Sequence, residues 1–333
     1  MTKGSRFTIQ RLRWTWGLVV IAAMAAVIAA PGRAKAANTG PIGIQISPVR
    51  VEVNVDPGQS YTFKVSPFNV TAGTLLLTPL VNDFKAKDET GTPAIVLDGS
   101  SPPSLSLKSW LTLSDPSPFQ LAPKTAKPII VTLNVPKDAE AGGHYGVVRF
   151  TGAGIGQTSS NVALVASWGT LVLVRVSGDI TERLSVASFY TSRHGLRSTW
   201  FEQGPVGFTE RINNTGNVHV EPHGNITVTN MFGGQVGSIA INGDGGNILP
   251  DSIRRFDQSF SKSHLFGRYT AAFNLAYGTH GETLSSSLTF WVIPYKLVII
   301  VIIALILVIW LLVWGIKRYN RKIVQRALDQ KRP

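Results

Sequence analysis

The sequence predicts an all-β protein with two tandem immunoglobulin-like β-sandwich domains, followed by a single transmembrane α-helix. Three observations predict this fold class. Between residues 38 and 293, apolar residues recur with a period of two, and Gly, Pro, Asn, Ser and Thr interrupt them at short intervals, as in short strands joined by turns. Residues 297–316 form an apolar run without a charge. The chain has no cysteine, so packed cores rather than disulfides must stabilise the domains.

The first 36 residues are typical of an export signal. A positively charged stretch ends at Arg13, an apolar stretch follows over residues 14–30, and Ala34-Lys35-Ala36 offers a small-residue cleavage site. We therefore expect a signal peptide over residues 1–36. An uncleaved signal anchor is the alternative, because the apolar stretch is long for a signal peptide. In both cases the residues that follow are expected outside the cytoplasm.

The second apolar run, residues 297–316, predicts a transmembrane helix. A helix of this length spans about 30 Å, the thickness of the bilayer hydrocarbon. Lys296 alone precedes the run, whereas four cations follow it within six residues, so the positive-inside rule places residues 317–333 in the cytoplasm as a short basic tail. The predicted location is the cell membrane, with a single pass and the body outside.

Positive charge is concentrated at the two ends of the chain. The formal net charge is +13, but residues 37–316 carry 19 cations and 18 acids. Affinity for nucleic acid depends on cations that neutralise phosphates, so the nearly neutral body is expected to bind no nucleic acid. Export without cysteines is more typical of a bacterial envelope than of an animal secretory pathway.

The first predicted domain covers residues 37–178. Ile44 and Ile46 continue an even-numbered apolar alternation, whereas Val49 to Val55 alternate on odd positions, with Pro48 between the two sets. Because a shift of one residue sends side chains to the opposite face, we expect this first strand to bend at Pro48 and to cross from one sheet to the other. A turn at residues 56–58 leads to a further strand, and later strands are predicted at 129–135, 144–150, 161–167 and 170–176.

The second predicted domain covers residues 181–294. Its apolar alternation predicts strands, separated by Asn- and Gly-rich turns, at residues 206–212, 225–231, 236–241, 268–277 and 286–293. Only Pro294-Tyr295-Lys296 separates the last strand from the apolar run. The second domain is therefore expected close to the membrane.

A family resemblance covers nearly the whole mature chain. It rests on the order of SPVRVEVNVDPGQSYTFKV, FQLAPKTAKPIIVTLNVPKDAEAGGHYGVVRF, NNTGNVHVEPHGNITVTNMFGG, ILPDSIRRF and FWVIPYKLV. This order resembles the WxL-interacting surface proteins of bacteria. The resemblance implies a peptidoglycan-binding-type domain at residues 37–178, a second, partner-binding domain at 181–294 and a transmembrane anchor. Motifs of the first half also occur in other bacterial sandwiches, including pilus-chaperone-like modules.

Three short segments of the sequence partly match the patterns of metal, calcium or dinucleotide sites. His219, Glu221 and His223 would share one face of a regular strand, as metal ligands do, but Pro222 disturbs that strand and the sequence offers no fourth ligand. The loop 242–247 resembles the opening of a calcium loop without its glutamate at the twelfth position, so we expect a plain hairpin connection. Residues 152–157 have glycines spaced unlike a dinucleotide fingerprint, and we interpret them as a flexible link.

No catalytic, cofactor-binding or metal-ligating residue is assigned from the sequence. The six histidines do not sit beside a nucleophile in a recognised signature, although a Ser-His-Asp set assembled in space stays open; they are His144, His194, His219, His223, His264 and His280. Aromatic residues of the body either form a glycan-stacking face or, for the most part, belong to the core; they include Trp110, Trp168, Trp200 and Phe232.

The predicted function is that of a noncatalytic membrane-anchored cell-surface protein that holds cell-wall polymer, such as peptidoglycan, or a secreted surface protein beside the membrane. Exposed edge strands would supply protein contacts by strand addition. Two alternatives stay open: a chaperone-like assembly factor for envelope proteins, and an envelope enzyme or metal-dependent module.

Overall fold

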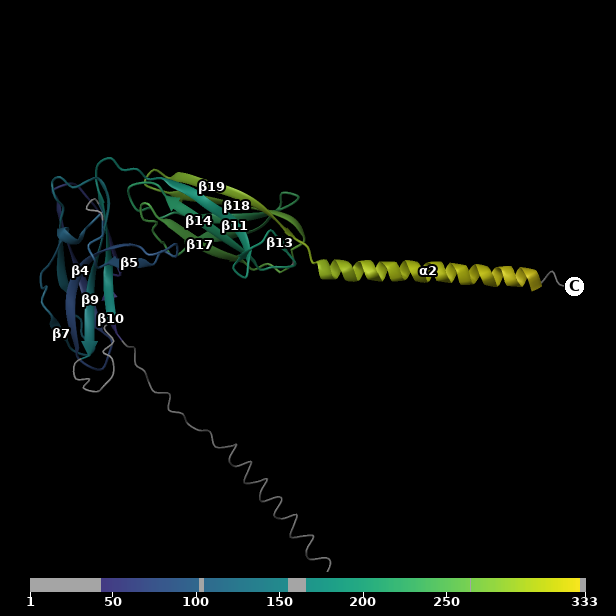
Figure 1. Cartoon of the computed structure of the whole chain (residues 1–333), viewed down its shortest axis with the longest axis horizontal. Helices are drawn as coiled ribbons and strands as arrows, with labels where there is room; N and C mark the ends of the chain where they lie inside the picture. The colour runs from purple at the N-terminus through teal and green to yellow at the C-terminus, as the bar shows by residue number, and fades with distance from the viewer. Residues whose placement is uncertain (1–42, 102–104, 155–165, 264, 330–333) are drawn as a thin grey trace, which may run out of the picture. The chain divides into compact units, whose positions relative to one another are not determined.

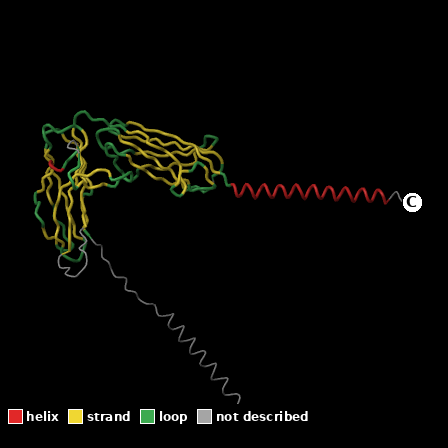
Figure 2. The backbone as a smooth tube through the Cα atoms, viewed as in Figure 1, coloured by secondary structure: helices red, strands yellow, loops and turns green. Residues whose placement is uncertain are grey.

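A computed structural model describes residues 43–101, 105–154, 166–263 and 265–329. The predicted signal peptide, residues 1–36, lies outside these ranges. The described chain is mostly β-strand, arranged in four sheets, with a long helix at the C-terminal end (Figures 1 and 2). The mostly β fold with one C-terminal helix is therefore confirmed, whereas the number of domains stays a prediction.

The first two sheets are built from residues 44–176. One sheet has the order β1(Ile44–Ser47), β3(Ser60–Asn69), β8(Ile129–Asn134), β6(Leu111–Leu113), and a short 3-10 helix, η1(Lys108–Trp110), precedes β6. The other has the order β2(Arg50–Val55), β10(Ala166–Val176), β9(Gly142–Gly154), β4(Leu75–Ala86), β5(Pro93–Val96), with β7(Phe119–Leu121) also paired to β4. Side chains of both sheets share one apolar core, including Val65 and Val131 from one and Val148 and Val172 from the other. We call these sheets the first sheet pair.

The crossing predicted at Pro48 is confirmed. β1 pairs with β3 in one sheet, whereas β2 pairs with β10 in the other. Ile44 and Ile46 are buried on β1, and Val55 is buried on β2, so the shift of phase at Pro48 keeps both halves of the segment packed on the same core. The parallel pairing of β2 with β10 joins residues about 120 positions apart, Arg50 with Leu171.

The other two sheets are built from residues 184–292, and we call them the second sheet pair. One has the order β12(Leu196–Arg197), β11(Leu184–Arg193), β14(Val206–Asn214), β17(Ile253–Phe260). The other has the order β13(Trp200–Phe201), β19(Glu282–Val292), β18(Gly267–Tyr277), β15(His223–Asn230), β16(Gln235–Ile241). These sheets enclose a separate apolar core that includes Phe208, Ile226, Phe273 and Phe290.

The prediction of a plain hairpin at residues 242–247 is wrong. This loop joins β16 to β17, which lie in different sheets of the second sheet pair. Phe256 and Phe260 of β17 are buried in the shared core, from the side opposite β16. Alternation of apolar residues gives the buried face of a strand, but it does not tell which sheet the strand joins.

The C-terminal helix, α2(Tyr295–Asp329), is longer than the predicted span of 297–316. Residues 295–321 are long and apolar enough to cross a membrane, by length and composition. Beyond the apolar run the sequence continues with good helix formers and without proline, so the helix continues into the basic tail. The membrane span and its orientation stay predictions.

Candidate functional site

One strand edge of the first sheet pair is only partly covered. β9 pairs with β10 along its whole length, from Ala166 to Val176, but β2 pairs only with Leu171–Val176. Among the described residues, no strand pairs with the outer side of residues 166–170. An unpaired row of main-chain groups beside an ordered strand is a template for a further strand.

The direction of the main-chain groups on this edge follows from the pairing of β2. The Leu171 N–H donates to the Val49 carbonyl oxygen at 3.0 Å, so odd-numbered residues of β10 present their N–H and C=O groups toward the outer side. Ser167 and Gly169 continue this row beyond the end of β2. We call these two residues the open edge. Ser167 is exposed and Gly169 is half-buried, and the neighbouring Thr170 hydroxyl donates to the Pro48 carbonyl oxygen at 2.7 Å.

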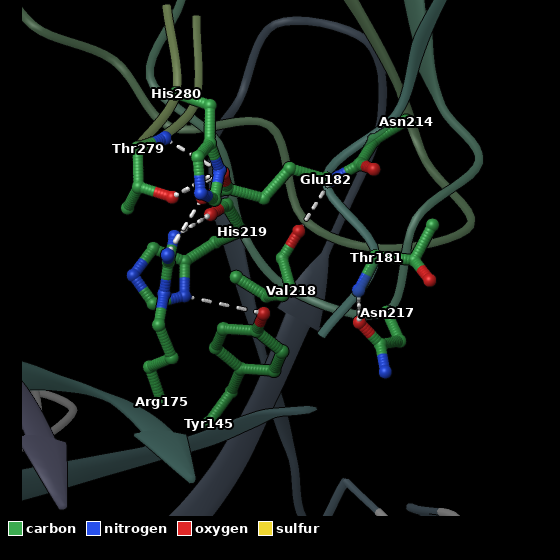
Figure 3. Close-up of polar contacts among 10 residues, drawn as sticks. All are labelled: Tyr145, Arg175, Thr181, Glu182, Asn214, Asn217, Val218, His219, Thr279 and His280. Atoms are coloured by element: carbon green, nitrogen blue, oxygen red, sulfur yellow. Dashed lines mark hydrogen bonds and ion pairs between the residues drawn. The ribbon is translucent and has the colours of Figure 1, made fainter. Parts of the chain in front are cut away.

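A polar network joins β10 to the second sheet pair (Figure 3). The Arg175 Nη1 donates to Glu182 Oε1 at 2.6 Å, and Arg175 Nη2 donates to the His219 carbonyl oxygen at 3.3 Å. The other Glu182 oxygen accepts from the Thr279 N–H at 2.6 Å and from its hydroxyl at 2.9 Å. Burial opposes ionisation of Glu182, but these hydrogen bonds outweigh it and hold its pKa below the ordinary value.

Tyr145 and His219 form the inner part of the same network. The Tyr145 hydroxyl lies 3.3 Å from His219 Nδ1, and both side chains are buried (Figure 3). Burial, together with the nearby cations Arg175 and Arg50, lowers the pKa of His219 to about 4, so its ring is neutral at physiological pH. Burial also raises the pKa of Tyr145 above its ordinary value. Both groups therefore act as neutral hydrogen-bonding partners.

Thr279 contacts both Glu182 and His280. His280 Nδ1 lies 3.2 Å from the Thr279 hydroxyl. Figure 3 shows the two side chains beside Glu182. The single hydroxyl proton of Thr279 is donated to Glu182, so the hydroxyl oxygen accepts a hydrogen bond from His280 instead of losing a proton to it. This arrangement holds the turn that contains Thr279 and His280 against Glu182.

Further polar contacts cross between the two sheet pairs. The Gly143 N–H donates to the Asn217 carbonyl oxygen at 2.8 Å, Arg211 of β14 forms a bidentate ion pair with Glu89, and Arg50 Nη1 donates to the Gly245 carbonyl oxygen at 2.9 Å. Apolar contact is small by comparison: a cluster around Phe84, Tyr145, Val147 and Leu173 includes Leu249 of the second sheet pair. The junction is therefore mainly polar.

A small pocket lies at this junction. Its volume is about 210 Å³, below the size of usual ligand pockets. Two cations, Arg50 and Arg254, and two acids, Asp88 and Asp244, are among the residues that line it. Burial and the charge of Arg50 lower the pKa of Arg254. Two cations balanced by two acids give the lining no net preference for an anion or a cation.

The structure separates the three residues first compared with a metal site. His219 is buried against Tyr145, the Glu221 carboxylate lies 3.8 Å from Arg50 Nη2, and His223 is exposed at the start of β15. Among the described residues, no group of three His, Cys, Asp or Glu side chains could hold a metal ion. The loop 242–247 is closed by Asn242, whose Oδ1 accepts from the Gly246 N–H at 2.8 Å.

The remaining sequence candidates fall in different places. His144 is buried beside Trp110, His194 and His280 are exposed in turns, and His264 lies outside the described residues. Gly152 to Gly154 belong to β9, whereas the rest of the predicted glycine-rich link lies outside the described residues. Trp110 and Trp168 pack against the first core, but Trp200 and Phe232 are exposed.

Sequence reasoning missed the residues of the polar junction and the open edge. Arg175 and Glu182 are seven residues apart and Tyr145 and His219 are 74 apart, so no local pattern links them. One signal was present for Arg175: it is the single charged residue in the apolar strand TLVLVRV, where a cation needs a partner. The open edge depends on where β2 ends relative to β10, which alternation does not reveal.

No family model matches this chain, and no curated protein matches it. Among solved structures, it is similar to the class 5 fimbriae chaperone CfaA, at 12% identity over 76% of this chain and 100% of that chain, with a TM-score of 0.36. It is also similar to the E. coli chaperone DraB, at 14% identity over 75% and 96% of the two chains, with a TM-score of 0.36. A structure of the Salmonella enterica SafA pilin in complex with the SafB chaperone gives 12% identity over 76% and 98%, with a TM-score of 0.36. These values assign the chain to no family.

Proposed function

We propose that this chain is a noncatalytic, membrane-anchored binding protein that holds an extended segment of a partner protein as an added strand along the open edge. The observation that carries the proposal is the length difference between the partners of β10. β9 pairs with all of Ala166–Val176, and β2 stops at Leu171. Ser167 and Gly169 thereby present two N–H and two C=O groups to a partner strand.

The surroundings of the open edge suit a protein segment. An added strand would continue the line of β2 and would lie beside the partly buried Trp168, which packs against the first core. Main-chain hydrogen bonds supply affinity for any extended sequence, and contact with Trp168 adds a preference for an apolar side chain. Helix α2 would hold this binding surface at the membrane, with the body outside the cytoplasm.

The test compares two substitutions at Ser167. Ser167→Pro removes the outward N–H, whereas Ser167→Ala keeps it and removes only the hydroxyl. Because an edge proline disturbs no bond to β9, both variants are expected to unfold at the same temperature as the parent chain. Partner recovered with the full chain from its native membrane, measured by quantitative mass spectrometry, should fall several-fold for Ser167→Pro and stay unchanged for Ser167→Ala, as expected for a lost hydrogen bond of about 1 kcal/mol.

Equal recovery with both variants would contradict strand addition at this edge. Hydrogen exchange on the purified complex gives a second readout: the Ser167 and Gly169 amides should become protected only when the partner is bound.

A chaperone-like assembly factor would use the same open edge for a different client. The two functions differ in the state of the partner, since an assembly factor holds a subunit before its own fold is complete. Protease sensitivity of the partner in the recovered complex separates them: a finished partner resists cleavage, and an unfinished subunit does not. Membership of the WxL-interacting family, and binding of peptidoglycan by residues 37–178, stay proposals that rest on the quoted motifs.

A further inference from the structure

The exposed large apolar side chains of the second sheet pair gather at one end of it. They are Leu196, Trp200, Met231, Phe232, Phe266 and Trp291. Scattered exposed apolar residues are ordinary on a protein surface, but a contiguous group marks an interaction surface.

Strand pairing places these residues at the same end. Trp291, near the end of β19, is paired with Trp200, and their rings are stacked at 5.6 Å. Phe266 lies just before β18, whose first residue, Gly267, is opposite Val292. Met231 and Phe232 follow β15, whose last residue, Asn230, is opposite Tyr269. Leu196 lies beyond the end of β11, opposite Arg193. This group is called the apolar end.

The hydrogen bonds of the turn at residues 230–234 fix the exposed position of Phe232. Asn230 Oδ1 accepts hydrogen bonds from the Phe232 N–H at 3.0 Å and from the Gly234 N–H at 2.9 Å. The Gly233 N–H donates to the Asn230 carbonyl oxygen at 3.0 Å, and Gly233 has a φ of 81°, a conformation that glycine adopts without strain. The hydrogen-bonded turn holds the Phe232 ring outward, where it is 88% exposed.

The opposite end of the second sheet pair has a different chemistry. Its loops are residues 214–222, 242–252 and 278–281, which are rich in Asn, Gly and Thr. Among the described residues, none of these loops contains an exposed large apolar side chain. The apolar character is thus confined to the end at which β19 leads into α2.

Cations surround the apolar end. Arg193, Arg197, Lys262, Arg268 and Lys296 are exposed there. The only acid in the loops and strand ends that form it is Glu202, whose Oε2 lies 3.0 Å from Lys296 Nζ. Aromatic rings mixed with an excess of cations suit the interface of a bilayer with anionic headgroups, where aromatic belts and basic residues concentrate.

Only a few residues separate the apolar end from the uncharged run of α2, so this end lies near any bilayer that the helix crosses. Trp291 is six residues before Leu297, where the uncharged run begins, so the two are at most about 20 Å apart along an extended chain. The interfacial layer of a bilayer is about 5 to 8 Å thick on each side of the hydrocarbon. The backbone before the helix is also tied down, because the Ile293 N–H donates to the Phe201 carbonyl oxygen at 2.8 Å.

From these observations we infer that the apolar end docks onto the outer leaflet of the same bilayer that α2 crosses, with Phe232 and Phe266 in the headgroup layer and the cations on anionic lipid. The inference rests on the proposed anchoring by α2. Docking at a second set of contacts restricts the tilt of the second sheet pair, which a single helix would not do.

The absence of cysteine makes a site-specific test direct. The full chain carrying Ser263→Cys, in the exposed loop beside Phe266, is labelled with bimane and reconstituted into vesicles of phosphatidylcholine and phosphatidylglycerol, 3:1. Quenching by a headgroup-attached nitroxide lipid is measured. Thr283→Cys is the matched control, because it is exposed on β19 about 30 Å from Val292. We expect at least fivefold stronger quenching at 263 than at 283, and weaker quenching when phosphatidylglycerol is omitted.

Two further arms decide the outcome. Phe232→Ser with Phe266→Ser, in the 263-labelled chain, should lower quenching to near the level at 283; both rings are exposed, so thermal unfolding should not change. Equal quenching at 263 and 283 overturns the inference and leaves the apolar end as a surface for a protein. Quenching at 263 that survives both substitutions also overturns it, because tethering alone then explains proximity. Failure of the anchor is distinct, since the chain would no longer float with vesicles after carbonate extraction.

Discussion

At the scale of single residues, Glu210 is the least expected group in the molecule. It lies on β14 between Phe208 and Ile212, which face the second core, and its side chain is fully buried. Among the described residues, neither carboxyl oxygen has a hydrogen-bond partner. Burial, with a contribution from the charge of Asp257, raises the pKa of Glu210 to about 8. The carboxyl group is therefore protonated at neutral pH.

This raised pKa predicts that the chain loses stability as pH rises from 6.5 to 8. The folded chain keeps on Glu210 a proton that the unfolded chain releases near the ordinary pKa of about 4.5. The free energy of unfolding therefore falls by about 1.4 kcal/mol per pH unit near pH 6.5 and by about half of that near pH 8. Glu210→Gln keeps the shape without an ionisable group and should remove the slope. Urea unfolding of the full chain in detergent, followed by tryptophan fluorescence at pH 6.5 and 8, checks it. A parent chain with no slope would contradict the buried, protonated state.

His219 has the opposite dependence on pH. Its pKa is lowered to about 4, so its contribution to stability is complete above the ordinary value of about 6.5 and is lost as pH falls toward 4. Between about pH 4.5 and 6.5 the two residues offset each other, because the gain at Glu210 balances the loss at His219. In Glu210→Gln only the loss at His219 remains, so the free energy of unfolding of this variant should fall as pH decreases below 6.5.

At the scale of elements, most strands were predictable because period two is a local signal. Residues 206–212, 236–241 and 268–277 lie within strands β14, β16 and β18. The same alternation places Glu210 on the core face of β14 with Phe208 and Ile212, although a charged residue type argues against burial. The sequence pattern does not predict which strands pair with each other, because partners such as β2 and β10 are about 120 residues apart. The polar junction and the open edge depend on such partners and needed the structure.

The polar junction predicts unequal effects of removing two arginines. The Arg175–Glu182 pair is mostly buried, with side-chain exposures of 19% and 6%, whereas Arg255 and Asp257 are 45% and 55% exposed. Arg175→Met leaves the Glu182 charge without its cation and should cost about 3 kcal/mol of unfolding free energy. Arg255→Met should cost under about 0.5 kcal/mol. Denaturant titration of both full-length variants measures the difference, and a cost for Arg175→Met as small as that for Arg255→Met would contradict the prediction.

At the scale of the whole molecule, the long apolar helix at the C-terminal end was the most predictable part. Hydropathy and flanking charge are properties of one continuous segment, so the helix that begins at Tyr295 could be located without any tertiary contact. Hydropathy and charge locate only the apolar run, so they do not predict the extension to Asp329, which follows from the helix-forming residues of the tail.

The predicted topology has a direct test. On intact cells without an outer membrane or a shielding wall, added protease should remove the body and leave a fragment that contains residues 297–333, detected through a C-terminal epitope. The physical reason is the excess of cations after the apolar run, which by the positive-inside rule should keep residues 317–333 in the cytoplasm. Cleavage of the tail with protection of residues 178–183 would reverse the orientation.

The parallel pairing of β2 with β10 also determines how late in folding β2 can find its partner strand. A chain made from its N-terminus at about 5 to 20 residues per second delivers residue 171 on the order of 10 s after residue 50. Until then β2 has no neighbour among the strands of the described chain, and closing so long a loop is slow. For that interval the main-chain groups of β2 are open to the same segment of another copy, a contact that the finished fold blocks.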